Sequence, residues 1–137
     1  MTDKIIVTNK SALTKKYGAS GWSKLEKAVN RLIKADKKRG IETRVVFLDE
    51  SADMQTNGGE VVTTPGSAMQ TKRAIDAIFK AFDPDYLLIL WAPDVVCHQE
   101  LNNPAYFPGK DDDAGVPSDL PYACEEGYSK DPTRFIG

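Results

Sequence analysis

Histidine and cysteine are scarce in this chain: its 137 residues include one histidine, His98, and two cysteines, Cys97 and Cys124. Two cysteines are too few for a disulfide framework. One bridge between them is an alternative, but two reduced thiols are favoured in a cytosolic setting. One histidine with two cysteines at this spacing is also a poor set of zinc ligands. The sequence therefore argues against a disulfide-rich or zinc-stabilised domain.

Long apolar runs are absent as well. No stretch approaches the roughly 20 apolar residues that a membrane-spanning helix needs. The first residues, MTDKIIVT, are too short and too polar for a signal peptide. We therefore expect a cytoplasmic protein with no membrane partner, unless an export segment has been removed.

Three familiar site motifs are missing. The chain has no G-x-x-x-x-G-K-[ST] and no G-x-G-x-x-G after its first apolar run, which argues against nucleotide hydrolysis and dinucleotide binding. It also lacks the G-x-S-x-G elbow of many serine hydrolases. No self-contained catalytic constellation is visible in the sequence.

The net charge is only −2, but the charge is unevenly distributed. Residues 1–50 carry 12 Lys and Arg against 6 Asp and Glu, whereas residues 51–137 carry 6 against 14. Such asymmetry can indicate nucleic-acid contact. Here the basic residues fall mainly on the polar side of a predicted helix and lack interleaved aromatic residues. We therefore expect no nucleic-acid partner.

What the sequence does contain is a regular succession of strand and helix patterns. Short apolar runs at 4–8, 43–48 and 86–91 predict three buried strands. Apolar residues at three- and four-residue spacing predict amphipathic helices over 22–39 and 68–82. The order strand, helix, strand, helix, strand favours parallel strands joined by right-handed crossovers. The predicted fold class is α/β, an incomplete three-layer sandwich with a mainly parallel sheet.

We expect residues 1–137 to form one domain with its core in residues 1–91. Residues 10–20 are polar and predict a loop. The segment 49–66 has no helical period and is long for a connection, which is typical of mobile or functional loops. A brief β-ribbon around 60–63 is an alternative there.

Residues 92–137 differ in character, because they hold six of the eight prolines and a cluster of acids. Short extended pieces are expected at 95–98, 120–124 and 134–136, and no helix of any length. We interpret this segment as a loop layer over the carboxyl edge of the sheet, where ligands bind in open α/β folds.

Cys97 and His98 are the only adjacent cysteine–histidine pair, and a thiolate nucleophile needs a base within hydrogen-bond reach. Neighbouring residues on a strand point to opposite faces, so these two side chains are not expected to meet. The favoured interpretation is a buried Cys97 and an exposed or hydrogen-bonded His98, with no catalytic role for either.

Carboxylates at Asp111, Asp112, Asp113 and Asp119 form the one candidate metal site, with Asp94 and Glu100 as further oxygen donors. Oxygen ligands of this kind suit Ca²⁺. The spacing does not match an EF-hand loop. A run of three acids is also typical of a solvated loop, and a metal-dependent hydrolase built on these acids is the weakest functional alternative.

Four stretches resemble gingipain-like cysteine peptidases, which have a caspase-like fold. They are residues 39–47 (RGIETRVVF), the strand and loop at 86–99 (YLLILWAPDVVCHQ), the acids 111–113 followed by 116–123 (VPSDLPYA), and residues 131–137 (DPTRFIG). Their order and spacing along nearly the whole chain carry the resemblance.

The resemblance implies a peptidase unit of two α/β subdomains side by side. In that family a histidine in a Gly-His-Gly setting and a cysteine ending a later strand lie in the second subdomain. Neither motif occurs here, so the chain is expected to be the first, non-catalytic subdomain. It would need a second peptidase subdomain, downstream or as a separate chain, and a polypeptide substrate.

The family also uses Ca²⁺ in places. The alternative function is a stand-alone, flavodoxin-like binding or regulatory domain, with its ligand seated on the loop layer.

Overall fold

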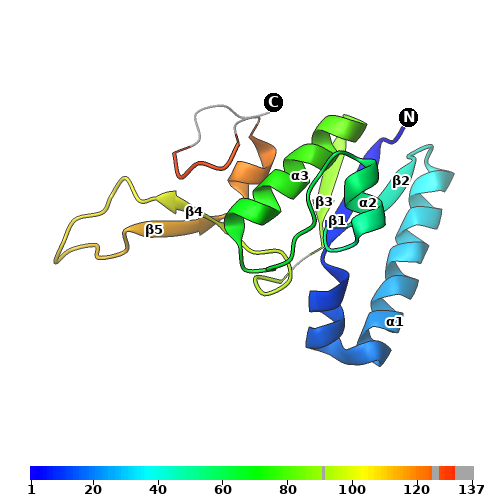
Figure 1. The fold of residues 1–137 in the computed structure, drawn as a ribbon, viewed down its shortest axis with the longest axis horizontal. Helices are drawn as coiled ribbons and strands as arrows, with labels where there is room; N and C mark the ends of the chain where they lie inside the picture. Colours follow the sequence, from blue (N-terminus) through cyan, green and yellow to red (C-terminus); the bar gives the residue numbers. More distant parts are fainter. Residues whose placement is uncertain (91, 125–126, 132–137) are drawn as a thin grey trace.

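The structure is a computed structural model that describes residues 1–90, 92–124 and 127–131. Its elements along the chain are β1 (Lys4–Thr8), α1 (Lys10–Lys38), β2 (Thr43–Phe47), α2 (Ser51–Thr56), α3 (Ala68–Phe82), β3 (Tyr86–Ile89), β4 (Gln99–Asn102), β5 (Gly115–Ser118) and the 3-10 helix η1 (Leu120–Ala123). The first three strands form a parallel sheet in the order β2-β1-β3. β4 and β5 pair in an antiparallel hairpin that projects from the body of the molecule (Figure 1).

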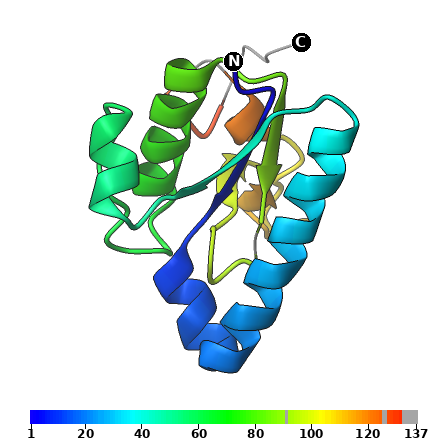
Figure 2. The same cartoon turned by 90° about the vertical axis from the view of Figure 1, so that its right-hand side faces the viewer.

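Helices cover both faces of the parallel sheet. α1 lies on one face, and α2 and α3 lie on the other (Figure 2). The side chains of β1 alternate accordingly. Ile5 and Val7 belong to the core that includes Ile75 of α3, whereas Ile6 lies with Leu25 of α1. The expected α/β class with a parallel sheet is confirmed.

The predicted loop at 10–20 is wrong, because α1 begins at Lys10. Asn9 caps the helix with its side-chain oxygen, and Asp49 binds the first N–H groups from across the sheet edge. At Gly18 the backbone has a φ of 70°, which kinks α1 into a short first arm and a longer second arm (Figure 2). Only the second arm carries the amphipathic pattern that the sequence displays.

The segment 49–66 contains α2, which the sequence did not predict. Met54 of α2 is fully buried and joins the core between α2 and the sheet. Six residues are too few for a helical period to be recognised. The β-ribbon at 60–63 does not form, but the Val62 N–H donates to the Leu48 carbonyl at 2.8 Å and holds this segment beside β2.

The loop layer is more structured than predicted. Residues 95–98 start in a turn rather than an extended piece, and the next strand is β4. The extended piece predicted at 120–124 is instead the helix η1, which has a proline in its first turn, where the fixed φ of proline suits a helix start. The piece predicted at 134–136 lies outside the described residues.

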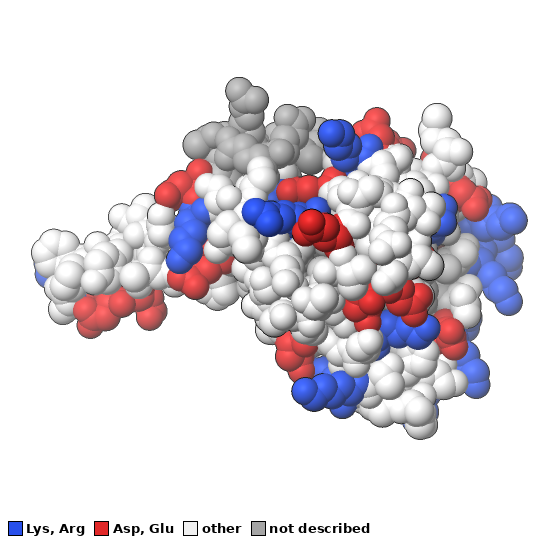
Figure 3. Space-filling model, in the orientation of Figure 1, with Lys and Arg blue, Asp and Glu red and all other residues white. Residues whose placement is uncertain are grey.

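The charge asymmetry of the sequence has a clear location. Basic side chains cluster along α1, and acidic side chains line one edge of the β4–β5 hairpin (Figure 3). Within the described ranges, no helix has both the length and the apolar composition needed to cross a membrane.

Candidate functional site

The carboxyl ends of β1 and β2 border a cavity of about 920 Å³. It lies between the first arm of α1 and the segment 61–66. Its polar lining includes Asn9, Lys15, Lys16, Asp49, Thr63 and Asp94. Ligands of open α/β folds bind outside the carboxyl ends of the strands, so this cavity is the candidate functional site.

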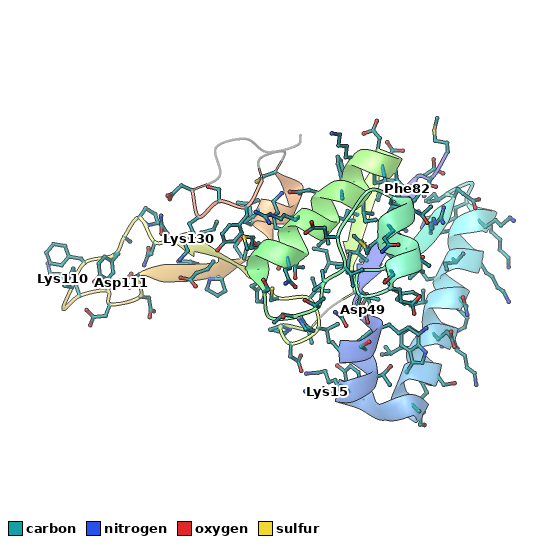
Figure 4. The ribbon with its side chains drawn as sticks, in the orientation of Figure 1. Lys15, Asp49, Phe82, Lys110, Asp111 and Lys130 are labelled. Carbon is teal, nitrogen blue, oxygen red and sulfur yellow. The ribbon has the colours of Figure 1, made fainter. Side chains whose placement is uncertain are left out.

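Asp49 determines what this cavity can accept. Its two carboxylate oxygens accept the backbone N–H groups of Lys10 at 2.8 Å and Ser11 at 2.9 Å. The Ala12 N–H donates to the side chain of Asn9 at 2.8 Å. Figure 4 shows Asp49 near the start of this first arm and Lys15 on the arm itself. A free helix N-terminus attracts phosphate, but here a carboxylate already occupies it, so the helix end is not an anion site.

Lys16 and Asp94 connect the first arm of α1 to the loop that follows β3. The Lys16 ammonium donates to both Asp94 carboxylate oxygens at 2.8 Å. The hydrogen bond lowers the pKa of Asp94 and raises the pKa of Lys16. Both side chains are substantially exposed, so the pair contributes little to stability. The two side chains line one side of the cavity.

Cys97 and His98 point to different partners. The Cys97 thiol is buried and lies 3.7 Å from the Thr71 hydroxyl oxygen. The His98 ring is hydrogen-bonded through Nδ1 to Asp119 Oδ1 at 2.8 Å, at the start of η1. The contacts given for the two side chains are thus with different residues, Thr71 for Cys97 and Asp119 for His98.

The acidic run lies in the loop between β4 and β5 (Figure 4). Asp111 accepts the Asn103 side-chain amide at 3.1 Å and the Asp113 N–H at 3.2 Å. Asp112 accepts the Gly109 N–H at 2.7 Å. These bonds hold the loop in its shape.

Each of the other candidate ligands has a partner of its own, although Glu100 lines one pocket together with Asp112 and Asp113. Asp119 pairs with His98, Asp94 pairs with Lys16, and Glu100 pairs with Lys130 at 3.4 Å. Among the residues that the structure describes, no three His, Cys, Asp or Glu side chains are grouped as metal ligands. The donor chemistry suits Ca²⁺, but the four predicted carboxylates are not brought together, and a shared site stays a prediction.

A buried polar network joins α3 to η1, and the sequence analysis missed it. Lys72 is 1% exposed; its ammonium donates to Asp76 and, at 3.0 Å, to the Cys124 carbonyl. The Tyr122 hydroxyl donates to the Cys97 carbonyl and accepts from the Gln99 side chain. Burial raises the pKa of Tyr122. One feature of the sequence could have revealed this network: Lys72 occupies a position in the apolar stripe of α3.

β3 is an open edge of the sheet. Among the described residues it pairs only with β1, and no strand lies on its other side. Tyr86 and Leu88, on the face that α1 covers elsewhere, are 58% and 40% exposed. The opposite edge differs, because β2 places the exposed Arg44 there, with its guanidinium 5.1 Å from the Phe82 ring centre.

No protein-family model matches this chain, and no curated protein and no solved structure is significantly similar to it.

Proposed function

We propose that this chain is the N-terminal, non-catalytic half of a gingipain-like cysteine endopeptidase. In this role it supports the central sheet and shapes the substrate cleft, and it is inactive alone. The four stretches quoted above, in their order, suggest the family. The observation that carries the proposal is the open, apolar edge of the sheet at β3. The cytoplasmic location stays a prediction.

An unprotected edge strand is uncommon in natural proteins, which use charges, prolines or bulges to prevent unwanted pairing. Arg44 provides such protection on β2. β3 has the sequence Tyr-Leu-Leu-Ile and contains none of these devices. One further strand beside β3 would cover Tyr86 and Leu88, as expected if a second subdomain continues the sheet.

The chemistry in this proposal comes from the second subdomain. Cys97 and His98 have separate partners, so this half supplies no dyad. The carboxyl edge of the sheet, with its cavity and the Lys16–Asp94 pair, would form one wall of a cleft for a polypeptide substrate. A wall of this kind positions substrate without contacting the reacting atoms.

The direct experiment compares this chain with the same chain extended by the codons that follow Gly137, assayed on a fluorescent casein. We expect cleavage only by the extended protein, with loss of activity when a downstream strand-ending cysteine is replaced. Cys97→Ala should leave that activity intact. Cleavage by the chain alone, or an extended protein without Gly-His-Gly and without activity, would contradict the proposal.

A second candidate is a stand-alone, flavodoxin-like binding or regulatory domain, and the 920 Å³ cavity at the carboxyl edge favours it. Its polar lining could orient a small ligand. This function predicts a ligand-dependent rise in the melting temperature of the purified chain. The shift should disappear in Lys15→Gln and persist in Lys110→Gln, a lysine in the distant hairpin loop.

A further inference from the structure

We infer that the strand that pairs with β3 alternates aliphatic side chains with Lys or Arg side chains. The inference rests on the proposed function, since the second peptidase subdomain would supply this strand. It is carried by two cavities of different chemistry that lie on opposite faces of β3.

The cavity on the α1 face is apolar. It has a volume of about 180 Å³ and is lined by Ile6, Leu25, Val29, Leu32, Leu88 and Leu90. Leu32 and Leu88 are 36% and 40% exposed, so the cavity is open to solvent beside β3. Apolar cavities of about 150 Å³ hold small hydrocarbons such as benzene. This one therefore has room for an aliphatic side chain such as that of valine.

The cavity on the α3 face has an apolar floor and an acidic rim. Its volume is about 520 Å³; Phe79, Leu87, Ile89 and Tyr122 line it together with Asp83 and Asp85. Both aspartates are exposed, and neither forms an ion pair with a residue that the structure describes. Asp119, the partner of His98, adds a third carboxylate to the lining.

Lys and Arg match this second cavity because their stems are apolar and their ends are cationic. The stem would lie over Leu87 and Ile89, and the charged end would reach Asp83 or Asp85. An acidic side chain would meet repulsion there, and a short aliphatic one would gain no interaction with the carboxylates.

Strand geometry links the two cavities. Successive side chains of a strand point to opposite faces of the sheet. A strand added beside β3 would therefore place one side chain in the apolar cavity and the next against the acidic rim. The alternation of aliphatic and basic residues follows from this period of two.

A second copy of this chain is a poorer occupant. Residues 86–89 contain no Lys or Arg, so pairing of β3 with another β3 would leave the acidic rims without cations. The charge of the rim thus favours a strand from a different part of the completed protein.

The test uses two fluorescein-labelled, end-blocked peptides with the repeats Val-Arg-Val-Arg-Val and Val-Glu-Val-Glu-Val, with binding to the purified chain measured by fluorescence anisotropy at low salt. We expect the Arg peptide to bind at least about fivefold more tightly than the Glu peptide. The double substitution Asp83→Asn and Asp85→Asn should weaken Arg-peptide binding by about five- to tenfold.

The matched control is the double substitution Asp112→Asn and Asp113→Asn, which removes the same charge from the hairpin loop and should leave binding unchanged. Leu88→Lys should weaken both peptides. Equal binding of the two peptides, or equal effects of the two aspartate pairs, would overturn the inference. Activity of the extended protein with no selective peptide binding would refute this inference alone, whereas selective binding with an inactive extended protein would refute the proposed function alone.

Discussion

Leu88 on β3 is the register partner of Ile6 on β1, yet Leu88 is 40% exposed and Ile6 is 1% exposed. The two residues lie on the same face of the sheet, towards α1. α1 and the two flanking strands enclose Ile6, whereas Leu88 has a neighbouring strand on one side only. The proposed function accounts for this difference, because a second subdomain would add a strand beside β3.

Asp36 should make stability depend on acid pH. Its buried carboxylate accepts hydrogen bonds from Lys4 Nζ and from the Thr43 hydroxyl, each at 2.8 Å. These two bonds, of which the one from Lys4 has the larger effect, lower the pKa of Asp36 below its ordinary value of 3.8. A lowered folded-state pKa stabilises the protein above the unfolded-state pKa, and this stabilisation is lost as the pH falls through the folded-state value.

We therefore expect Asp36→Asn to lower the free energy of unfolding at pH 7, with the difference from the unmodified chain shrinking as the pH falls below about 4. Urea titrations at pH 7 and at pH 3 measure it. Glu60→Gln, for an exposed carboxylate, is the control. A difference that stays constant across this range would show that the carboxylate charge has no role.

Replacing Lys72 should lower the free energy of unfolding more than replacing a surface lysine does. Its ammonium is buried, and Lys72→Met leaves the Cys124 carbonyl and Asp76 without this donor. Burial raises the pKa of Asp76, and the bond to Lys72 opposes that rise. We expect a loss of about 2 kcal/mol, because Asp76 is only partly shielded from water.

The double substitution Lys72→Met and Asp76→Leu should recover part of this loss, since it removes the uncompensated charge together with its partner. Chemical denaturation of the single and double variants measures the difference. The loss of unfolding free energy in the double variant should be smaller than the sum of the losses in Lys72→Met and Asp76→Leu. A larger loss than this sum would contradict this account of the buried pair.

The regular core was predictable because its signals are local. The apolar runs of β1, β2 and β3 and the spacing in α3 and the second arm of α1 are visible in the sequence. Ser67 caps α3 by accepting the Gln70 N–H, and the helix ends at Asp83 before Pro84. Such signals lie within a few residues of the element that they define.

The elements that escaped prediction depend on distant partners. The first arm of α1 is capped by Asp49, about 40 residues away, and its sequence carries no apolar stripe. β4 and β5 are four residues each, and β5 contains Pro117. The buried Lys72 is bonded to the carbonyl of Cys124, the residue that follows η1, 52 residues away in the chain. Local pattern cannot reveal contacts of this kind.

The predicted Ca²⁺ site gives a separate expectation. If Asp111, Asp112, Asp113 and Asp119 hold Ca²⁺, millimolar CaCl₂ should raise the melting temperature, because a ligand that binds only the folded state stabilises it. Joint replacement of Asp111, Asp112 and Asp113 by Asn should abolish the shift. MgCl₂ at the same concentration is the control for ionic strength. A shift that survives the triple replacement would place the ion elsewhere.

The central claim is that β3 becomes an interior strand when the second subdomain is present, and Leu88→Ala tests it most directly. In the chain alone we expect a cost in unfolding free energy below about 1 kcal/mol, against about 2–5 kcal/mol for Ile6→Ala. In the protein extended beyond Gly137 the cost of Leu88→Ala should rise to about 2–4 kcal/mol, as for a buried leucine. An equally small cost of Leu88→Ala in both proteins would show that no strand covers β3 and would contradict the account.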